Sequence, residues 1–92
     1  MSDHAYRGLH YDDPHVQAEF ERLVQRIGDA ERARAPIAER HRKAERDTES
    51  GAISDARFRS IDDEYIAANN AIAAAQRAVD DFLRIHRNYQ TS

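Results

Sequence analysis

Two ladders of mostly apolar residues run through this 92-residue chain, with each rung three or four positions after the last. The first ladder is Val16, Phe20, Leu23, Ile27, Ala30, Arg34, Ile37, His41 and Ala44; the second is Phe58, Ile61, Tyr65, Ala68, Ile72, Ala75, Val79, Phe82 and His86. Such spacing predicts the apolar stripe of an amphipathic α-helix. Every rung of the first ladder has a counterpart in the second at the same distance from Gly51. Because folding the chain about that glycine brings all counterparts together, the sequence predicts an all-α fold, an antiparallel two-helix coiled-coil hairpin.

Short local signals set the expected limits of the two helices. Asp13 can accept hydrogen bonds from free backbone N–H groups, and Pro14 suits the first helical position. Gly51 can adopt the left-handed conformation that ends a helix, and Ser54 can cap the next one. Pro36 falls inside the first helix, where we expect a kink because the ladder keeps its phase across it; a complete break is the alternative.

These signals divide the chain into an arm and one helical domain. We expect a hairpin over residues 13–92, with helices at about 14–49 and 54–88 joined by a turn at 50–53. Residues 1–12 have no helical period, so they predict a flexible arm. The alternative is that this arm, which carries Tyr6, Leu9 and Tyr11, docks on the bundle or on a partner.

Composition narrows the functional class. The 14 basic and 17 acidic residues are mixed along the chain, a balance unlike that of a protein that coats nucleic acid. The chain has no cysteine, so it cannot use thiolate chemistry or disulfides. The start of the chain lacks a signal-peptide pattern, and the longest apolar run, Ala71–Ala75, is too short for a membrane span. We therefore expect a cytoplasmic protein that uses no membrane; the preference for Arg and Ala suggests a bacterial or phage gene.

Two polar rungs interrupt the apolar seam. Arg34 can lay its apolar stem over Ala68 while its charge reaches water, or it can fix the register of the helices. His41 has Glu45 one turn later and Asp62 nearly opposite. A metal site usually needs a third or fourth well-placed ligand, and bundle metal enzymes use a Glu-x-x-His pattern that this chain lacks.

Apolar residues remain that a single seam cannot cover. They lie on both flanks of the second helix and on one part of the first: Ile66, Ala73 and Leu83; Ala78 and Ile85; and Val24. A helix with apolar residues well beyond one stripe is normally buried on more than one side. We therefore predict a protein interface at these residues, most simply a homodimer that forms a four-helix bundle.

The functional expectation follows from this surface and from missing motifs. No catalytic or cofactor motif is present, so we expect neither an enzyme nor a bound cofactor. We expect the side chains of His10, His15 and His86 to be solvated rather than bound to a metal. The leading hypothesis is a protein-interaction module, such as an adaptor, assembly factor or sequestering inhibitor, that binds itself and a heterologous protein. The alternative is nucleic-acid binding at the turn, where basic residues gather: Arg40, Arg42, Lys43, Arg46, Arg57 and Arg59. Interleaved acidic residues make that alternative the weaker one.

Overall fold

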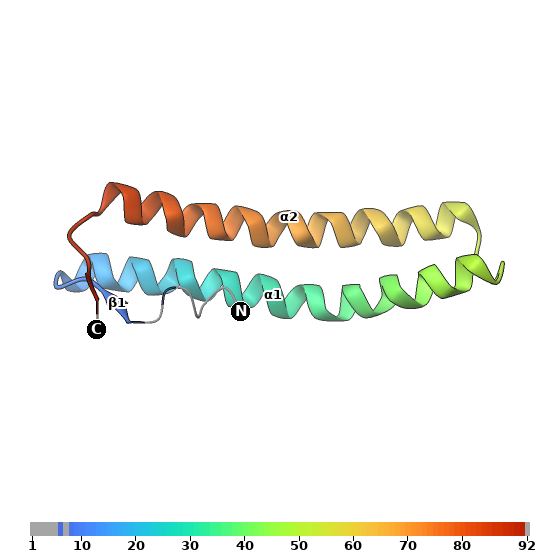
Figure 1. The fold of residues 1–92 in the computed structure, drawn as a ribbon, viewed down its shortest axis with the longest axis horizontal. Coiled ribbons are helices and arrows are strands. Elements are labelled where there is room, and N and C mark those ends of the chain that lie inside the picture. Colours follow the sequence, from blue (N-terminus) through green and yellow to red (C-terminus); the bar gives the residue numbers. More distant parts are fainter. Residues whose placement is uncertain (1–5, 7, 92) are drawn as a thin grey trace.

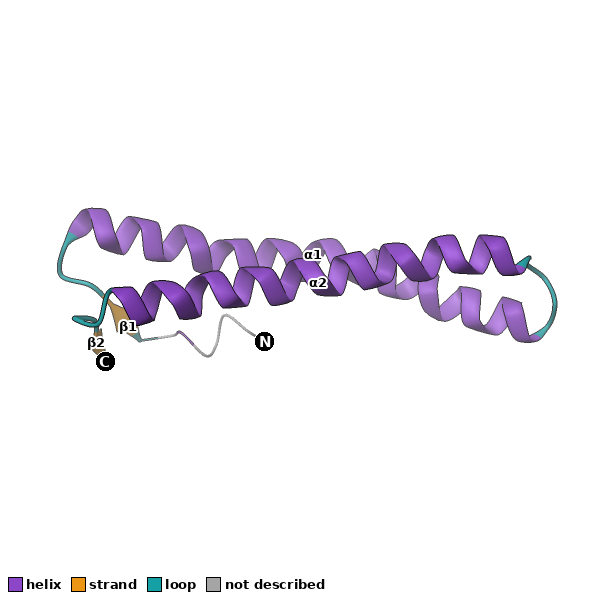
Figure 2. Ribbon diagram, turned by 90° about the horizontal axis from the view of Figure 1, so that it is seen from above, coloured by secondary structure: helices purple, strands orange, loops and turns teal. Residues whose placement is uncertain are grey.

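The computed structural model describes residues 6 and 8–91 and consists of two long helices packed side by side (Figures 1 and 2). Helix α1 spans Pro14–Glu49 and helix α2 spans Asp55–Ile85. The helices run in opposite directions and form a rod with extents of 57 × 20 × 15 Å. The predicted antiparallel helical hairpin is therefore confirmed.

The helix ends are formed by side chains that the sequence singled out. The Asp13 carboxylate accepts hydrogen bonds from the backbone N–H groups of His15 and Val16, at 2.8 and 3.2 Å. The Ser54 hydroxyl accepts one from Arg57 at 3.1 Å, which caps α2. In the turn between the two helices Gly51 has a φ of +76°, a backbone conformation that residues with a side chain adopt only at a cost in free energy. Helix α1 continues through Pro36 without a break.

The second helix ends earlier than expected, at Ile85 rather than near Asn88. Beyond His86 the chain leaves the helix and forms strand β2, Gln90–Thr91. This strand pairs antiparallel with strand β1, Leu9–His10, in the register Leu9 with Thr91 and His10 with Gln90. The early end therefore lets the C-terminal segment close the open end of the hairpin against residues from the other end of the chain (Figure 2).

The core lies along the predicted seam. The buried rungs are Phe20, Ile27, Ala44, Ile72, Ala75, Val79 and Phe82, and among these Ile27, Ala75 and Val79 are completely inaccessible to solvent. Every one of them belongs to one of the two ladders. Large side chains such as Ile27 on one helix have small counterparts such as Ala75 on the other, and this complementarity lets the facing layers interdigitate.

The N-terminal segment supplies one more core residue, Tyr11, which is 4% exposed. Its ring lies edge-on to Phe20 and Phe82, at centroid distances of 5.5 and 5.6 Å. Its hydroxyl donates a 2.6 Å hydrogen bond to the backbone carbonyl of His86, just past the end of α2. The described part of the predicted arm thus packs on the hairpin, which corresponds to the docking alternative; residues 1–5 and 7 lie outside the described residues.

Candidate functional site

The outer face of α2 is the candidate functional surface. From Ala67 to Ala78 this helix carries a single charged residue, Arg77, and its other residues are Ala, Asn, Gln and one Ile. Ile66, at the start of this stretch, is 49% exposed. An exposed β-branched side chain beside a row of small residues is a surface onto which another helix can pack closely.

The predicted interface residues do not all contribute to this surface. Ile66 and Ile85 are exposed, at 49% and 74%, while Ala73 and Ala78 are partly buried. Val24 and Leu83 pack against the core cluster that contains Tyr11, so the chain covers much of these two side chains itself. Val24 also lines a surface groove of about 340 Å³ together with Tyr6 and Leu9 of the N-terminal segment.

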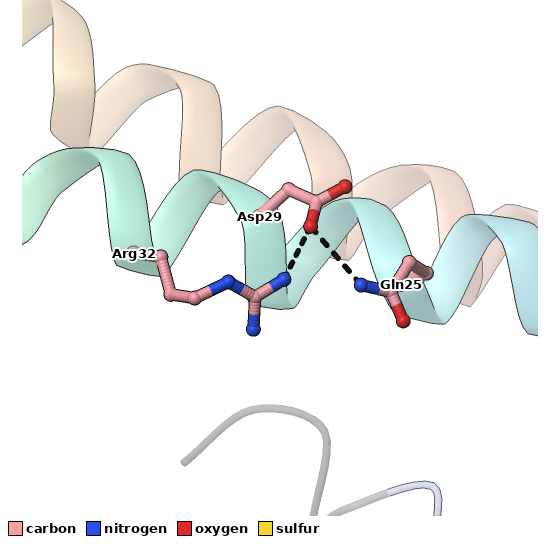
Figure 3. Close-up of polar contacts among 3 residues, drawn as sticks. All are labelled: Gln25, Asp29 and Arg32. Carbon is pink, nitrogen blue, oxygen red and sulfur yellow. Dashed lines mark hydrogen bonds and ion pairs between the residues drawn. The ribbon is translucent and has the colours of Figure 1, made fainter.

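Some exposed polar residues of α1 pair with each other along the helix. Asp29 accepts hydrogen bonds from Arg32 and, at 3.0 Å, from Gln25, so the three side chains are linked along the helix (Figure 3). Arg42 forms an ion pair with Glu39 in the same one-turn arrangement. Exposed pairs of this kind contribute little stability, at most about 1 kcal/mol each.

The outer side of α2 leaves charges without such partners. Arg59, Asp63 and Arg77 are exposed and form no ion pair within the part of the chain that the structure describes. Asn70, between the last two, is exposed as well. Asp63, Asn70 and Arg77 were not predicted as site residues from the sequence, although their seven-residue spacing, about two helical turns, places them on one helix face.

At the turn, the structure brings together some of the predicted basic residues and separates others. Arg40, Lys43 and Arg57 line a groove of about 240 Å³ with Asp47. Arg40 is paired with Glu64 across the helices, and Arg42 is paired with Glu39. Lys43, Arg46, Arg57 and Arg59 form no ion pair with any described residue.

The polar rungs of the seam are held by local partners. Arg34 donates a 3.0 Å hydrogen bond to the side-chain oxygen of Asn69, so it links the two helices. His41 lies 2.8 Å from the Asp62 carboxylate and 3.4 Å from that of Glu45, and its ring stacks on Tyr65 at 4.4 Å. This layer joins α1 to α2 by polar contacts and thereby favours one register of the hairpin.

The histidines and the helix lengths add two further findings. Among residues 6 and 8–91, no three His, Asp or Glu side chains are grouped so that they could hold a metal ion. His86 instead packs against Phe82, with ring centroids 4.3 Å apart. Neither described helix has an apolar stretch long enough to cross a membrane.

The chain matches no family model, no curated protein and no solved structure. The arrangement of its surface is therefore the main guide to function.

Proposed function

We propose that this chain is a non-catalytic protein-binding module in which the outer face of α2 packs against a helix of another protein molecule. The observation that carries the proposal is the exposed Ile66 beside a charge-poor row of small residues on a helix whose opposite side already forms the core. Small side chains allow a partner helix to approach closely, and burial of apolar area contributes about 25 cal/mol per Å².

The thin core of a two-helix hairpin makes such an interaction favourable. Domains of this size bury a modest fraction of their surface and often depend on association for stability. Covering a further few hundred Å² of apolar surface would contribute several kcal/mol at the same coefficient. The proposal includes self-association of two hairpins into a four-helix assembly, and binding of a heterologous protein at the same face.

Placing a charge in this face is expected to abolish the association. Ala73→Glu and Ile66→Glu would bury a carboxylate without a partner at the contact. This is unfavourable because the carboxylate loses its hydration and gains no compensating hydrogen bond or ion pair. We expect the variants to lose oligomer mass in light scattering after size exclusion, measured across a dilution series. A photo-reactive residue at position 66 would report binding to another protein in cells.

The matched control is Ala35→Glu, which makes the same change at an exposed position of α1. We expect it to keep the wild-type mass and the wild-type crosslinks. If all three variants form the same assemblies as the wild type, the outer face of α2 is not the binding surface and the proposal fails.

Nucleic-acid binding at the turn is the second candidate function. It is favoured by the basic residues there that form no ion pair with any described residue, namely Lys43, Arg46, Arg57 and Arg59. Cations without a carboxylate partner can bind phosphates, with an affinity that falls steeply with salt. We expect the triple variant Arg42→Glu, Lys43→Glu and Arg46→Glu to abolish any gel-mobility shift of a nucleic-acid probe. A shift that persists unchanged in this variant would reject this candidate.

A further inference from the structure

Two ladders with seven-residue spacing lie on the outer side of α2, away from the buried seam. The first is Asp63, Asn70 and Arg77, and the second is Arg59, Ile66, Ala73 and Asp80. Each ladder carries opposite charges at its two ends. All seven residues are exposed except Ala73, which is partly buried. Seven residues correspond to about two helical turns, so the members of each ladder follow one line along the helix.

Each ladder is complementary to its own reversed copy. If a second α2 lies antiparallel with the two Asn70 side chains facing each other, Asp63 of each copy meets Arg77 of the other. In the neighbouring ladder Arg59 then lies within one residue of the level of Asp80, about 1.5 Å along the helix, and the large Ile66 lies equally close to the level of the small Ala73. Opposite charges and complementary sizes therefore meet at every level of the contact.

A parallel arrangement lacks this complementarity. Side by side and in register, two α2 helices would place Asp63 opposite Asp63 and Arg77 opposite Arg77. Like charges that face each other directly are destabilising, and such contacts exclude a wrong arrangement as effectively as attractive ones favour the right one.

We infer that the occupant of the α2 outer face is a second copy of this chain, packed antiparallel about a two-fold axis at Asn70. This inference rests on the proposed function, since it names the partner for the same face. The charges support it, because Asp63, Arg77 and Arg59 have no ion-pair partner within the described residues and can pair with the second copy. On the axis, the two Asn70 amides can donate to and accept from each other, which fixes the register.

Disulfide trapping tests the inference directly, because the chain contains no cysteine. The variant Asn70→Cys places two thiols next to each other at the axis, within the short distance that a disulfide requires. The matched control Ala56→Cys lies on the same line of the helix, two heptads before Asn70, at an exposed position. In the antiparallel dimer its two copies are about 42 Å apart, at ~1.5 Å per residue, and cannot be bridged.

We expect oxidation to convert most of Asn70→Cys to a covalent dimer on a non-reducing gel, and Ala56→Cys to stay monomeric. Crosslinking of both variants would show a parallel dimer and overturn the inference, as would crosslinking of neither.

Charge exchange gives a second measurement that does not depend on oxidation. Asp63→Arg alone places two arginines opposite each other in each of the two symmetric contacts, so we expect at least a tenfold weaker dimer in sedimentation equilibrium. Adding Arg77→Asp in the same chain restores opposite charges and is expected to recover the wild-type affinity. Failure of the second change to rescue the first would contradict the antiparallel arrangement.

The two proposals can fail separately. If position 66 crosslinks to a different protein while Asn70→Cys forms no dimer, the protein-binding function stands and the second-copy inference is wrong. If Ile66→Glu and Ala73→Glu change no assembly at all, both the proposed function and the second-copy inference fail.

Discussion

Tyr11→Ala is expected to lower the free energy of unfolding by about 3–5 kcal/mol, the range measured when a buried aromatic side chain is truncated to alanine. Tyr11 is 4% exposed and its ring contacts both Phe20 and Phe82, so its removal leaves a cavity between the ends of the two helices. It also removes the hydrogen bond to the His86 carbonyl that ties the N-terminal segment to the end of α2. Urea unfolding followed by circular dichroism would measure the loss.

Tyr11→Phe separates the hydrogen bond from the packing. This variant keeps the ring but loses the hydroxyl, so we expect it to cost only about 1 kcal/mol. Amide exchange at Leu9 and Gln90 should be faster in Tyr11→Ala than in Tyr11→Phe, because the pairing of β1 with β2 depends on the anchored ring. An alanine variant as stable as the wild type would show that the N-terminal segment does not pack on the core.

Titration of the Tyr11 hydroxyl is expected to lower the free energy of unfolding at alkaline pH. Burial raises the pKa of Tyr11 above its ordinary value of 10.0, and the neighbouring Tyr89 adds to the increase. Its folded-state pKa is therefore higher than its unfolded-state pKa, so its contribution is complete below pH 10 and is lost as the pH rises above it. Since Tyr11→Phe lacks this group, the difference in stability between wild type and variant should shrink above pH 10. A difference that stays constant through that range would contradict the burial of the Tyr11 hydroxyl.

The helical hairpin could be predicted from the sequence because its core is periodic. Each buried rung of the seam, such as Ile27 or Val79, repeats at helical spacing, and the symmetry about Gly51 gives the pairing of the two helices. Local signals at Asp13 and Ser54 were sufficient for the caps, because a cap depends on hydrogen bonds within a few residues.

The closure of the open end could not be predicted in the same way. Tyr11 contacts Phe82 and His86, which are more than seventy positions away, and a single buried residue in a segment without period leaves no pattern. The two-residue strands β1 and β2 are likewise too short to be recognised from alternation. For the candidate site, the flank residues Ile66 and Ala73 were identified by their apolar character, whereas Asp63, Asn70 and Arg77 look like ordinary solvated residues until the ion pairs of the hairpin are known.

Exchanging the large and the small side chain of one seam pair is the strictest test of how the two helices are aligned along their length. Ile27 and Ala75 are both fully buried on counterpart rungs of the two ladders. Ile27→Ala alone should cost about 2–5 kcal/mol through the cavity that it leaves. Ala75→Ile alone should cost about 1–3 kcal/mol, because the extra methylene groups overfill a packed layer.

Combined in one chain, the two changes exchange the large and the small side chain across the same layer. We therefore expect the double variant to be more stable than Ile27→Ala alone, with a coupling of at least about 1 kcal/mol between the two positions in urea unfolding. The matched control combines Ile27→Ala with Ala44→Ile, which adds the same volume at another buried alanine about 25 Å farther along α1, at ~1.5 Å per residue. Distant sites do not compensate each other, so this control should show additive losses. Equal coupling in both double variants would mean that Ile27 and Ala75 do not share a layer, and the register centred on Gly51 would be wrong.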